Sequence, residues 1–354
     1  MISQLAVFHH EIAKELFNDS NTDFIKSVFN HLNELRKESY DNYNFLYDQV
    51  VSLGEILSTK IISKFLKSTE LRVEWIDARK IIRTNNCYRE SEVNWSETEK
   101  LVNNCIDFKE VEIYVTQGFI GHTDDGETTT LGREGSDFSA GILAYCCNAE
   151  SVTIWKDVAG MLNADPKWFD NTIKLDRISF REAIELSYYG ASVIHPKTIK
   201  PLQNKQIPLY VKSFVNPNEE GTIIQASTAD DHLIPSFIFK MNQILFSITP
   251  KDFSFLVEKN LSDIFSRLSQ ANAKINLMQN SALNFSILLD EDKIDVDQIL
   301  SLFKDSYHVK FNGGLELVTI RHYDDSTINR VTVDKEILLQ QKTRETARLI
   351  VRQL

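Results

Sequence analysis

Along the first part of the chain, apolar residues recur every three or four positions, with polar residues between them. This spacing is typical of amphipathic helices, and it predicts helical structure across residues 1–37. Residues 45–65 repeat the pattern, with Val50, Leu53 and Leu57 on one face. We therefore expect most of the first 65 residues to be helical.

From residue 71 to residue 214, short runs with strand-like alternation come between helical segments. Strands are predicted at residues 71–78, 111–119, 151–158 and 207–214. Helices are predicted from a capping box of Ser96 and Glu99 to about Phe108, from Ser136 to about Asn148, and from a capping box of Ser179 and Glu182 to Gly190. Strands that alternate with helices indicate an α/β fold with a mostly parallel sheet.

The pattern changes near residue 226. Residues 227–241 include a polar, irregular stretch, which predicts a linker between a first domain of residues 1–226 and the rest of the chain. Residues 242–312 show the order strand, helix, strand, strand, helix, which a strand at 315–323 completes as a ferredoxin-like unit. Residues 313–354 read as a shortened second unit, in which that strand is followed by a hairpin with little room for a helix.

Composition narrows the class of protein. The hydrophobic share of 42% and the charged share of 25% are ordinary for a globular protein, and 354 residues suggest two or three domains. The net charge of −11 argues against nucleic acid or an anionic membrane as the main partner. The apolar runs are far shorter than the roughly 18 residues of a membrane span. The four cysteines form no C-x-x-C pair, so we expect a cytoplasmic protein.

The glycines point to a candidate site. Seven of the twelve lie between residues 118 and 160. There a predicted strand leads into a glycine turn, the hydroxyls of residues 128–130 follow, and Arg133 stands just before a predicted helix start at Ser136. Free backbone N–H groups at a helix start, together with a guanidinium, favour an anion. We therefore expect a site for an anionic small molecule, although Thr- and Gly-rich loops also connect elements without binding anything.

The order of the motifs resembles one known family. TQGFIG and TTTLGR-x-GSD lie within residues 115–167, SLGEILSTKI is found at 52–61, WIDARKIIRTN at 75–85, and ELSYYGASVIHPKTIKPL at 185–202. Together they resemble the aspartate kinase family over roughly residues 45–354. The resemblance implies a three-layer amino-acid-kinase (carbamate-kinase-like) α/β domain, followed by α+β ferredoxin-like ACT domains.

The resemblance also implies an activity and a substrate site. Aspartate kinases use ATP with Mg²⁺ to phosphorylate the side-chain carboxylate of L-aspartate, giving 4-aspartyl phosphate, the first step of the lysine, threonine and methionine pathway. By the same resemblance Arg133 and Asp137 are catalytic. Glu55, Thr130, Arg133 and Ser136 would bind the substrate.

A second set of positions matches the nucleotide site of the family. Its members are Lys156, Asp157, Leu162, Asp165, Lys167 and Ser192. Lys156 and Lys167 stand where the family usually has Thr and Arg, and a lysine neutralises phosphate without the bidentate geometry of arginine. We expect no protein ligands for a metal, and we interpret His122–Asp125 as a solvated turn and His195 as a structural turn residue.

The C-terminal half resembles ACT regulatory domains, which bind lysine or threonine and commonly pair across subunits. The resemblance therefore implies an amino-acid effector and a homodimer. Asn276 and Gln279 are the candidate effector residues. Asn276 stands where relatives that sense lysine often have Asp, and an amide holds an ammonium group less well than a carboxylate does.

Two family motifs, a K-F-G-G-T-S loop and an S-x-M-x-x-T-T-N-like stretch that helps hold the substrate, have no counterpart in these 354 residues. Family members carry a K-F-G-G-T-S loop on their first strand, whose lysine binds the transferred phosphate, and we expect the kinase domain here to be truncated at its N-terminus. Two hypotheses follow: the sequence is a fragment of an ordinary aspartate kinase, or it is a non-catalytic paralogue that binds amino acids. Under either hypothesis we expect little kinase activity from this chain alone.

Overall fold

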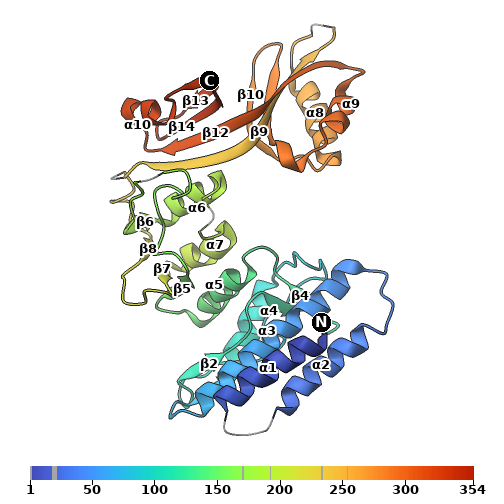
Figure 1. The fold of residues 1–354 in the computed structure, drawn as a ribbon, viewed down its shortest axis with the longest axis vertical. Coiled ribbons are helices and arrows are strands. Elements are labelled where there is room, and N and C mark those ends of the chain that lie inside the picture. Colours follow the sequence, from blue (N-terminus) through green and yellow to red (C-terminus); the bar gives the residue numbers. More distant parts are fainter. Residues whose placement is uncertain (1, 18–21, 170, 192, 233, 253) are drawn as a thin grey trace. The chain divides into compact units, whose positions relative to one another are not determined.

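The computed structural model describes residues 2–17, 22–169, 171–191, 193–232, 234–252 and 254–354 (Figure 1). The chain divides into two compact units, which are described separately. The first unit comprises residues 1–161, 176–187 and 192–228, and the second comprises residues 162–175, 188–191 and 229–354.

Three helices form the N-terminal part of the first unit: α1 (Ile2–Leu16), α2 (Asp23–Leu35) and α3 (Tyr43–Lys67). Their apolar faces meet in one buried cluster that includes Ile25, Leu53 and Leu57, as the spacing of apolar residues predicted. Asn42 caps α3, because its side-chain oxygen accepts a hydrogen bond from the backbone N–H of Phe45 at 3.1 Å. On another face, Ile56 of α3 contributes to a second buried cluster, so α3 connects the helical region to the sheets.

Two small sheets and two helices surround that second cluster. Strand β1 (Val73–Trp75) pairs in parallel with β2 (Ile113–Val115), and β3 (Ile120–His122) pairs antiparallel with β4 (Thr128–Thr130). The short helix η1 (Ala78–Lys80) follows β1, and α4 (Trp95–Cys105) and α5 (Gly135–Cys147) complete the group. The predicted capping box of Ser96 and Glu99 is wrong: Asn94 caps α4, because its Oδ1 accepts a hydrogen bond from the N–H of Glu97 at 3.2 Å.

The remaining strands of the first unit form a four-stranded sheet in the order β5-β7-β8-β6. These strands are β5 (Val152–Lys156), β7 (Leu209–Ser213), β8 (Thr222–Gln225) and β6 (Arg177–Ser179). The pairs β5-β7 and β6-β8 are parallel, and β7-β8 is antiparallel. Helices α6 (Phe180–Tyr189) and α7 (Pro196–Lys205) accompany this sheet. Ser179 accepts a hydrogen bond from the N–H of Glu182 at 2.9 Å, as predicted.

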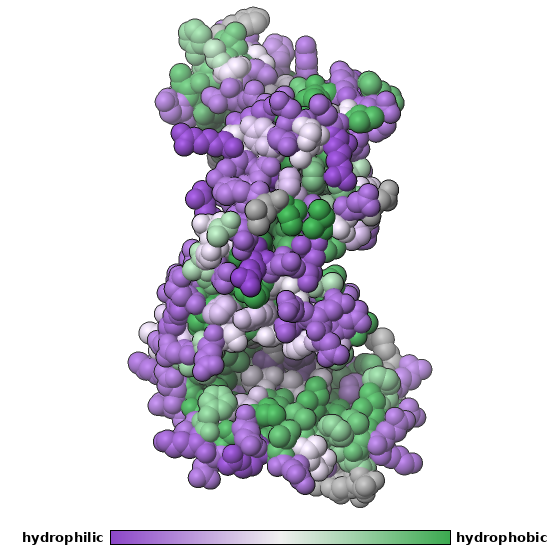
Figure 2. All heavy atoms as spheres, turned by 90° about the vertical axis from the view of Figure 1, so that its left-hand side faces the viewer, coloured by the Kyte–Doolittle hydropathy of each residue, from purple (hydrophilic) through white to green (hydrophobic). Residues whose placement is uncertain are grey.

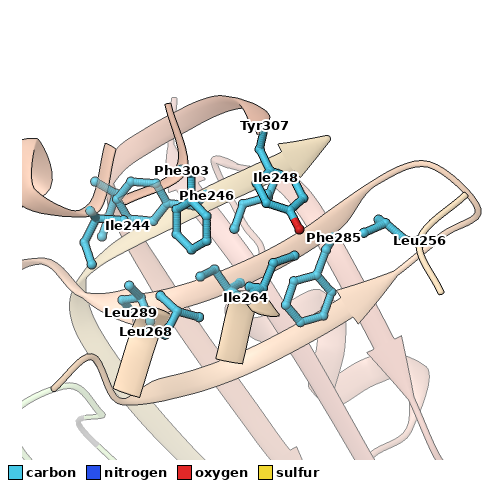
Figure 3. Close-up of a cluster of buried hydrophobic side chains, with 12 residues drawn as sticks. Ile244, Phe246, Ile248, Leu256, Ile264, Leu268, Phe285, Leu289, Phe303 and Tyr307 are labelled. Carbon is cyan, nitrogen blue, oxygen red and sulfur yellow. The ribbon is translucent and has the colours of Figure 1, made fainter. Parts of the chain in front are cut away.

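The second unit is built on one antiparallel sheet in the order β10-β11-β9-β12-β14-β13. Its elements are β9 (Ser236–Pro250), α8 (Glu258–Gln270), β10 (Ile275–Asn280), β11 (Phe285–Asp290), η2 (Glu291–Lys293), α9 (Val296–Phe303), β12 (Tyr307–Arg321), α10 (Asp325–Val331), β13 (Lys335–Lys342) and β14 (Thr346–Gln353). The predicted strand–helix order of the ferredoxin-like unit is observed, and α8 and α9 cover one face of its strands. Buried side chains of the strands and helices, including Phe246 of β9, Ile264 of α8 and Phe303 of α9, pack together in Figure 3.

Two features of the second unit differ from the sequence prediction. Residues 236–241, placed in the predicted linker, form the first part of β9 and pair with β12. The final segment was expected to leave little room for a helix, yet α10 occupies residues 325–331. Asp324 makes this short helix possible, because its side chain accepts a hydrogen bond from the N–H of Thr327 at 2.8 Å while the Thr327 hydroxyl accepts one from the N–H of Asp324.

None of the helices in the described part of the chain is both long and apolar enough to cross a bilayer. The face drawn in Figure 2 mixes hydrophilic and hydrophobic residues, and the hydrophobic ones gather most densely in its lower part. Among the exposed apolar side chains are Leu5, Val7 and Phe8 of α1.

Candidate active site

An open cleft of about 1000 Å³ lies in the first unit, between one face of α3, the loop before α4 and the turn that leads into α5. Its lining residues come from all three segments: Asn44, Tyr47, Val51, Cys87, Tyr88, Arg89, Glu90, Phe119, Thr130, Gly132 and Arg133. The cleft therefore contains two of the residues assigned to the substrate by the sequence, Thr130 and Arg133.

Arg133 offers its guanidinium to this cleft. The residue is exposed, and within the described ranges its side chain makes no hydrogen bond or ion pair. A guanidinium is always protonated at physiological pH and presents a planar set of N–H donors. Arg133 is thus available to hold a carboxylate or a phosphate through two parallel hydrogen bonds.

Glycines allow the backbone around Arg133 to pack closely. A Cβ at Gly135 would lie 2.5 Å from Cβ of Phe119, and a Cβ at Gly118 would lie 2.6 Å from Oγ of Ser136. Any side chain at either position would force the turn away from the helix start. The glycine cluster in the sequence therefore serves close contact between β2, the turn and the first residues of α5.

Glu55 and Ser136 are brought to the same place by Gly118. The carboxylate Oε1 of Glu55 accepts a hydrogen bond from the N–H of Gly118 at 3.0 Å, and Ser136 packs against that glycine. Ser136 is exposed in the first turn of α5, where backbone N–H groups and the helix dipole favour an anion. A carboxylate suited to an ammonium group and a helix N-terminus suited to an anion thus lie side by side.

Thr130 is held in place by Asp48, a residue that the sequence analysis did not single out. The fully buried carboxylate of Asp48 accepts the Thr130 hydroxyl at 2.8 Å and the Thr130 N–H at 2.9 Å. The neighbouring Thr129 hydroxyl is also engaged, at 2.6 Å from the Thr84 hydroxyl. Thr130 therefore fixes the β3-β4 hairpin to α3, and Thr129 fixes it to the segment that follows η1. The only sequence signal for Asp48 is a carboxylate on the otherwise apolar face of a predicted helix.

Tyr88 is a second cleft residue that sequence reasoning did not single out. Its hydroxyl donates a short hydrogen bond to Glu127. Burial, followed by the hydrogen bond to this carboxylate, raises the pKa of the Tyr88 phenol well above its usual value. Tyr88 therefore stays protonated at neutral pH and serves as a neutral wall of the cleft.

Asp137 and Lys156 form an ion pair at the start of α5. The ammonium Nζ of Lys156, at the end of β5, lies 2.7 Å from Oδ2 of Asp137, and both side chains are largely shielded from solvent. Sequence reasoning assigned Asp137 to catalysis and Lys156 to phosphate binding. The structure places them in direct contact, so Asp137 fixes the position of a cation beside the helix N-terminus.

The other nucleotide positions are distributed over both units. Asp157 is exposed directly after β5, in the first unit. Leu162, Asp165 and Lys167 belong to the second unit, where Oδ1 of Asp165 accepts a hydrogen bond from the N–H of Lys167 at 2.9 Å. Ser192 lies outside the described residues. Assignment of these positions to a nucleotide remains a prediction.

The histidines have structural surroundings. Of the predicted solvated turn at His122–Asp125, Asp124 and Asp125 form an exposed turn, whereas His122 is buried at the end of β3, and burial lowers its pKa. His195 caps α7, because its Nδ1 accepts a hydrogen bond from the N–H of Lys197 at 3.1 Å. Within the described ranges, no three His, Cys, Asp or Glu side chains are grouped so as to hold a metal ion.

In the second unit, the buried side chain of Asn276 belongs to a network of hydrogen-bonded polar side chains. Its amide Nδ2 donates to Asp290 and to Gln243, both at 2.8 Å, and its Oδ1 accepts from Lys240 at 2.9 Å. Asn276 is the extra residue at a register shift between β10 and β11, and such a bulge re-aims a side chain. Gln279, the other candidate effector residue, is exposed on β10. The two are therefore in different environments.

Comparisons with known proteins agree with this fold. Residues 6–213 match the model of the amino acid kinase family. The chain therefore belongs to the amino acid kinase family, and the predicted fold class is confirmed.

Within that family, the chain is similar to proteins named as aspartokinases. Lysine-sensitive aspartokinase 3 of Escherichia coli is 31% identical over 284 residues, which are 78% of this chain and 63% of the relative. The bifunctional aspartokinase/homoserine dehydrogenase of Buchnera aphidicola is 32% identical over 299 residues, 82% of this chain and 36% of the relative. The chain thus spans less than two thirds of the length of these curated relatives.

Solved structures have a similar fold. E. coli aspartokinase III in complex with aspartate and ADP has a TM-score of 0.80 and 26% sequence identity, covering 99% of this chain and 82% of that one. The aspartate kinase of Clostridium acetobutylicum, at 20% identity and a TM-score of 0.76, has the same fold.

Proposed function

We propose that this chain is an aspartate kinase, which transfers the γ-phosphoryl group of ATP to the side-chain carboxylate of L-aspartate. The observation that carries the proposal is the fold of the TTTLGR-x-GSD segment. It presents the guanidinium of Arg133 to the cleft and starts α5 two residues later. The similarity to a structure that contains aspartate and ADP supports the same substrates.

Each group has a role that its surroundings suit. Arg133 holds a substrate carboxylate in its planar fork, and the carboxylate of Glu55 receives the substrate ammonium group. Ser136 and the first N–H groups of α5 face the phosphoryl group, and the Lys156 cation held by Asp137 neutralises phosphate charge. Phosphoryl transfer depends mainly on such positioning and charge neutralisation.

Mg²⁺ would arrive with the nucleotide. It commonly keeps several water ligands and binds through substrate phosphates, so it would be held by the phosphates of ATP, in agreement with the expectation that the protein supplies no metal ligand. When bound, the ion offsets negative charge on the phosphates. Asp157, Leu162, Asp165, Lys167 and Ser192 remain candidate nucleotide positions by the resemblance of the sequence.

We assign the second unit to feedback regulation by an amino acid, with lysine or threonine as candidate effectors and a homodimer as the assembly. One similar solved structure is E. coli aspartokinase III in complex with lysine and aspartate. In this chain the amide oxygen of Asn276 already accepts a hydrogen bond from Lys240. Asn276 would therefore bind the ammonium group of an effector more weakly than a carboxylate would. The four free cysteines suit a reducing cytosol.

The test is aspartate binding and phosphate transfer by the purified chain. Calorimetry is expected to detect aspartate binding, and Arg133→Ala is expected to weaken it at least thirtyfold, the equivalent of about 2 kcal/mol for a charge-assisted contact. Arg36→Ala, which removes an exposed arginine at the end of α2, is the matched control and should bind like the wild type. Equal affinity of wild type and Arg133→Ala would contradict the proposal.

Turnover separates the two hypotheses about activity. These 354 residues contain no K-F-G-G-T-S loop, so we expect slow formation of aspartyl phosphate by this chain alone. Aspartate binding with no ATP-dependent product would support the alternative of an amino-acid-binding module. Product formation that Arg133→Ala abolishes would establish a kinase.

A further inference from the structure

Arg89 has an unusual backbone conformation at the edge of the cleft. Its φ of 71° lies in the left-handed region, which is unfavourable for residues with a Cβ and freely accessible to glycine. Non-glycine residues in this region persist where the surrounding structure holds them, often at ligand sites.

One buried carboxylate fixes both sides of the cleft. Oδ2 of Asp48 accepts the N–H of Arg89 at 2.9 Å and the N–H of Thr130 at 2.9 Å. The carbonyl oxygen of Arg89 lies beside Gly132, where a Cβ would approach it to 3.1 Å. The loop that carries Arg89 is thus tied to the segment that carries Arg133, so both arginines are positioned by the same contacts.

The side chain of Arg89 is oriented by α3. Its guanidinium stacks over the ring of Tyr47, 4.7 Å from the ring centroid, and Nη1 donates to Oδ1 of Asn44 at 3.4 Å. All three residues line the cleft, and Arg89 is exposed there. Within the described residues no carboxylate pairs with this guanidinium, so most of its N–H donors remain available.

The charges in the cleft select a class of ligand. The lining contains two guanidinium groups, those of Arg89 and Arg133, and the carboxylate of Glu90. An amino acid with an acidic side chain has two carboxylates, one for each guanidinium, and its ammonium group is the one proposed to meet Glu55. A neutral amino acid would leave one arginine of the cleft without an anionic partner.

We propose that Arg89 is a second carboxylate-binding residue and that it makes the site specific for a dicarboxylic amino acid. Each carboxylate of the substrate is held by its own guanidinium, one by Arg133 and the other by Arg89. This inference rests on the proposed function, because it assigns a further residue to the same aspartate site.

Arg89→Gly tests this role without straining the backbone. Glycine adopts the left-handed conformation without the steric cost of a Cβ, so the variant is expected to fold at least as well as the wild type. In calorimetry we expect its aspartate affinity to fall about tenfold or more, while its affinity for asparagine, which lacks the second carboxylate, changes less than threefold. Gln206→Gly is the matched control: it relieves a similar φ of 57° at the end of α7, and it should leave both affinities unchanged.

The outcomes distinguish this inference from the function on which it rests. Wild-type aspartate affinity in Arg89→Gly, together with loss of binding in Arg133→Ala, would overturn the role of Arg89 and leave the proposed function intact. An equal loss for aspartate and asparagine would also overturn it, because that result would mean a structural role. Absence of aspartate binding by the wild type would remove the proposed function and this inference together.

Discussion

At the scale of single residues, Asp48 explains how the cleft keeps its shape. It is a fully buried carboxylate that accepts three hydrogen bonds, two from Thr130 and one from Arg89. A buried carboxylate is stable only when such donors surround it. Asp48 itself touches no part of the open cleft surface, so its influence on substrate passes through the two residues that it holds.

Asp48→Asn is expected to damage both stability and binding. An amide oxygen can still accept the two backbone N–H groups and its N–H₂ can donate to the Thr130 hydroxyl, but the negative charge that strengthens all three hydrogen bonds is lost. We expect the free energy of unfolding to fall by about 2–4 kcal/mol, as when other buried hydrogen-bond networks are disrupted. Urea unfolding followed by circular dichroism measures this change.

A matched control distinguishes a local effect from general fragility. Thr59→Ser retains a hydroxyl elsewhere on α3, where Thr59 donates to the Glu55 carbonyl at 3.0 Å, and it should cost far less than Asp48→Asn. If Asp48→Asn unfolds at the same urea concentration as the wild type, Asp48 does not hold the cleft in the way described.

At the scale of elements, the polar network of Asn276 joins three neighbouring strands. Gln243 comes from β9, Asn276 from β10 and Asp290 from the end of β11. Burial alone would raise the pKa of Asp290. Hydrogen bonds from Gln243, Lys293 and Asn276 outweigh that effect and lower the pKa to about 2. The network therefore favours the charged carboxylate.

This shift predicts a dependence of stability on acid. The folded-state pKa of Asp290 lies below its unfolded value of about 3.9, so its contribution is present above that value and is lost as the pH falls toward 2. Because the carboxylate is only partly buried, we expect about 1 kcal/mol. Unfolding free energies of wild type and Asp290→Asn, measured from pH 5 to pH 2, should converge toward the acid end. A constant difference across that range would show that Asp290 does not titrate as described.

The elements also show what the sequence could predict. The long helices, β5 and the strand–helix order of the ferredoxin-like unit follow from apolar spacing, because each buries one face. The short strands β3 and β4 have no alternation long enough to recognise, and α10 depends on one cap at Asp324. In the site, Arg133 was recognisable from its motif. Asp48 and Arg89 were not, because their roles come from contacts between segments far apart in the chain.

At the scale of the whole molecule, the net charge of −11 contrasts with a cleft that contains two arginines. A negative protein repels an anionic substrate at long range, so local cations must provide the attraction. The chain belongs to the amino acid kinase family, and the proposed function assigns these cations to the carboxylates of aspartate. The central claim is therefore that aspartate occupies this cleft.

Two exposed cysteines allow a direct test of that claim. Cys87 lines the cleft, whereas Cys105 ends α4 and is not among the cleft residues, and both thiols are free. Mass spectrometry can follow the alkylation of each thiol by iodoacetamide, with and without saturating aspartate. We predict that aspartate slows alkylation of Cys87 several-fold and leaves Cys105 unchanged. Equal rates at Cys87 with and without aspartate, under conditions where calorimetry shows binding, would place the ligand elsewhere and contradict the account.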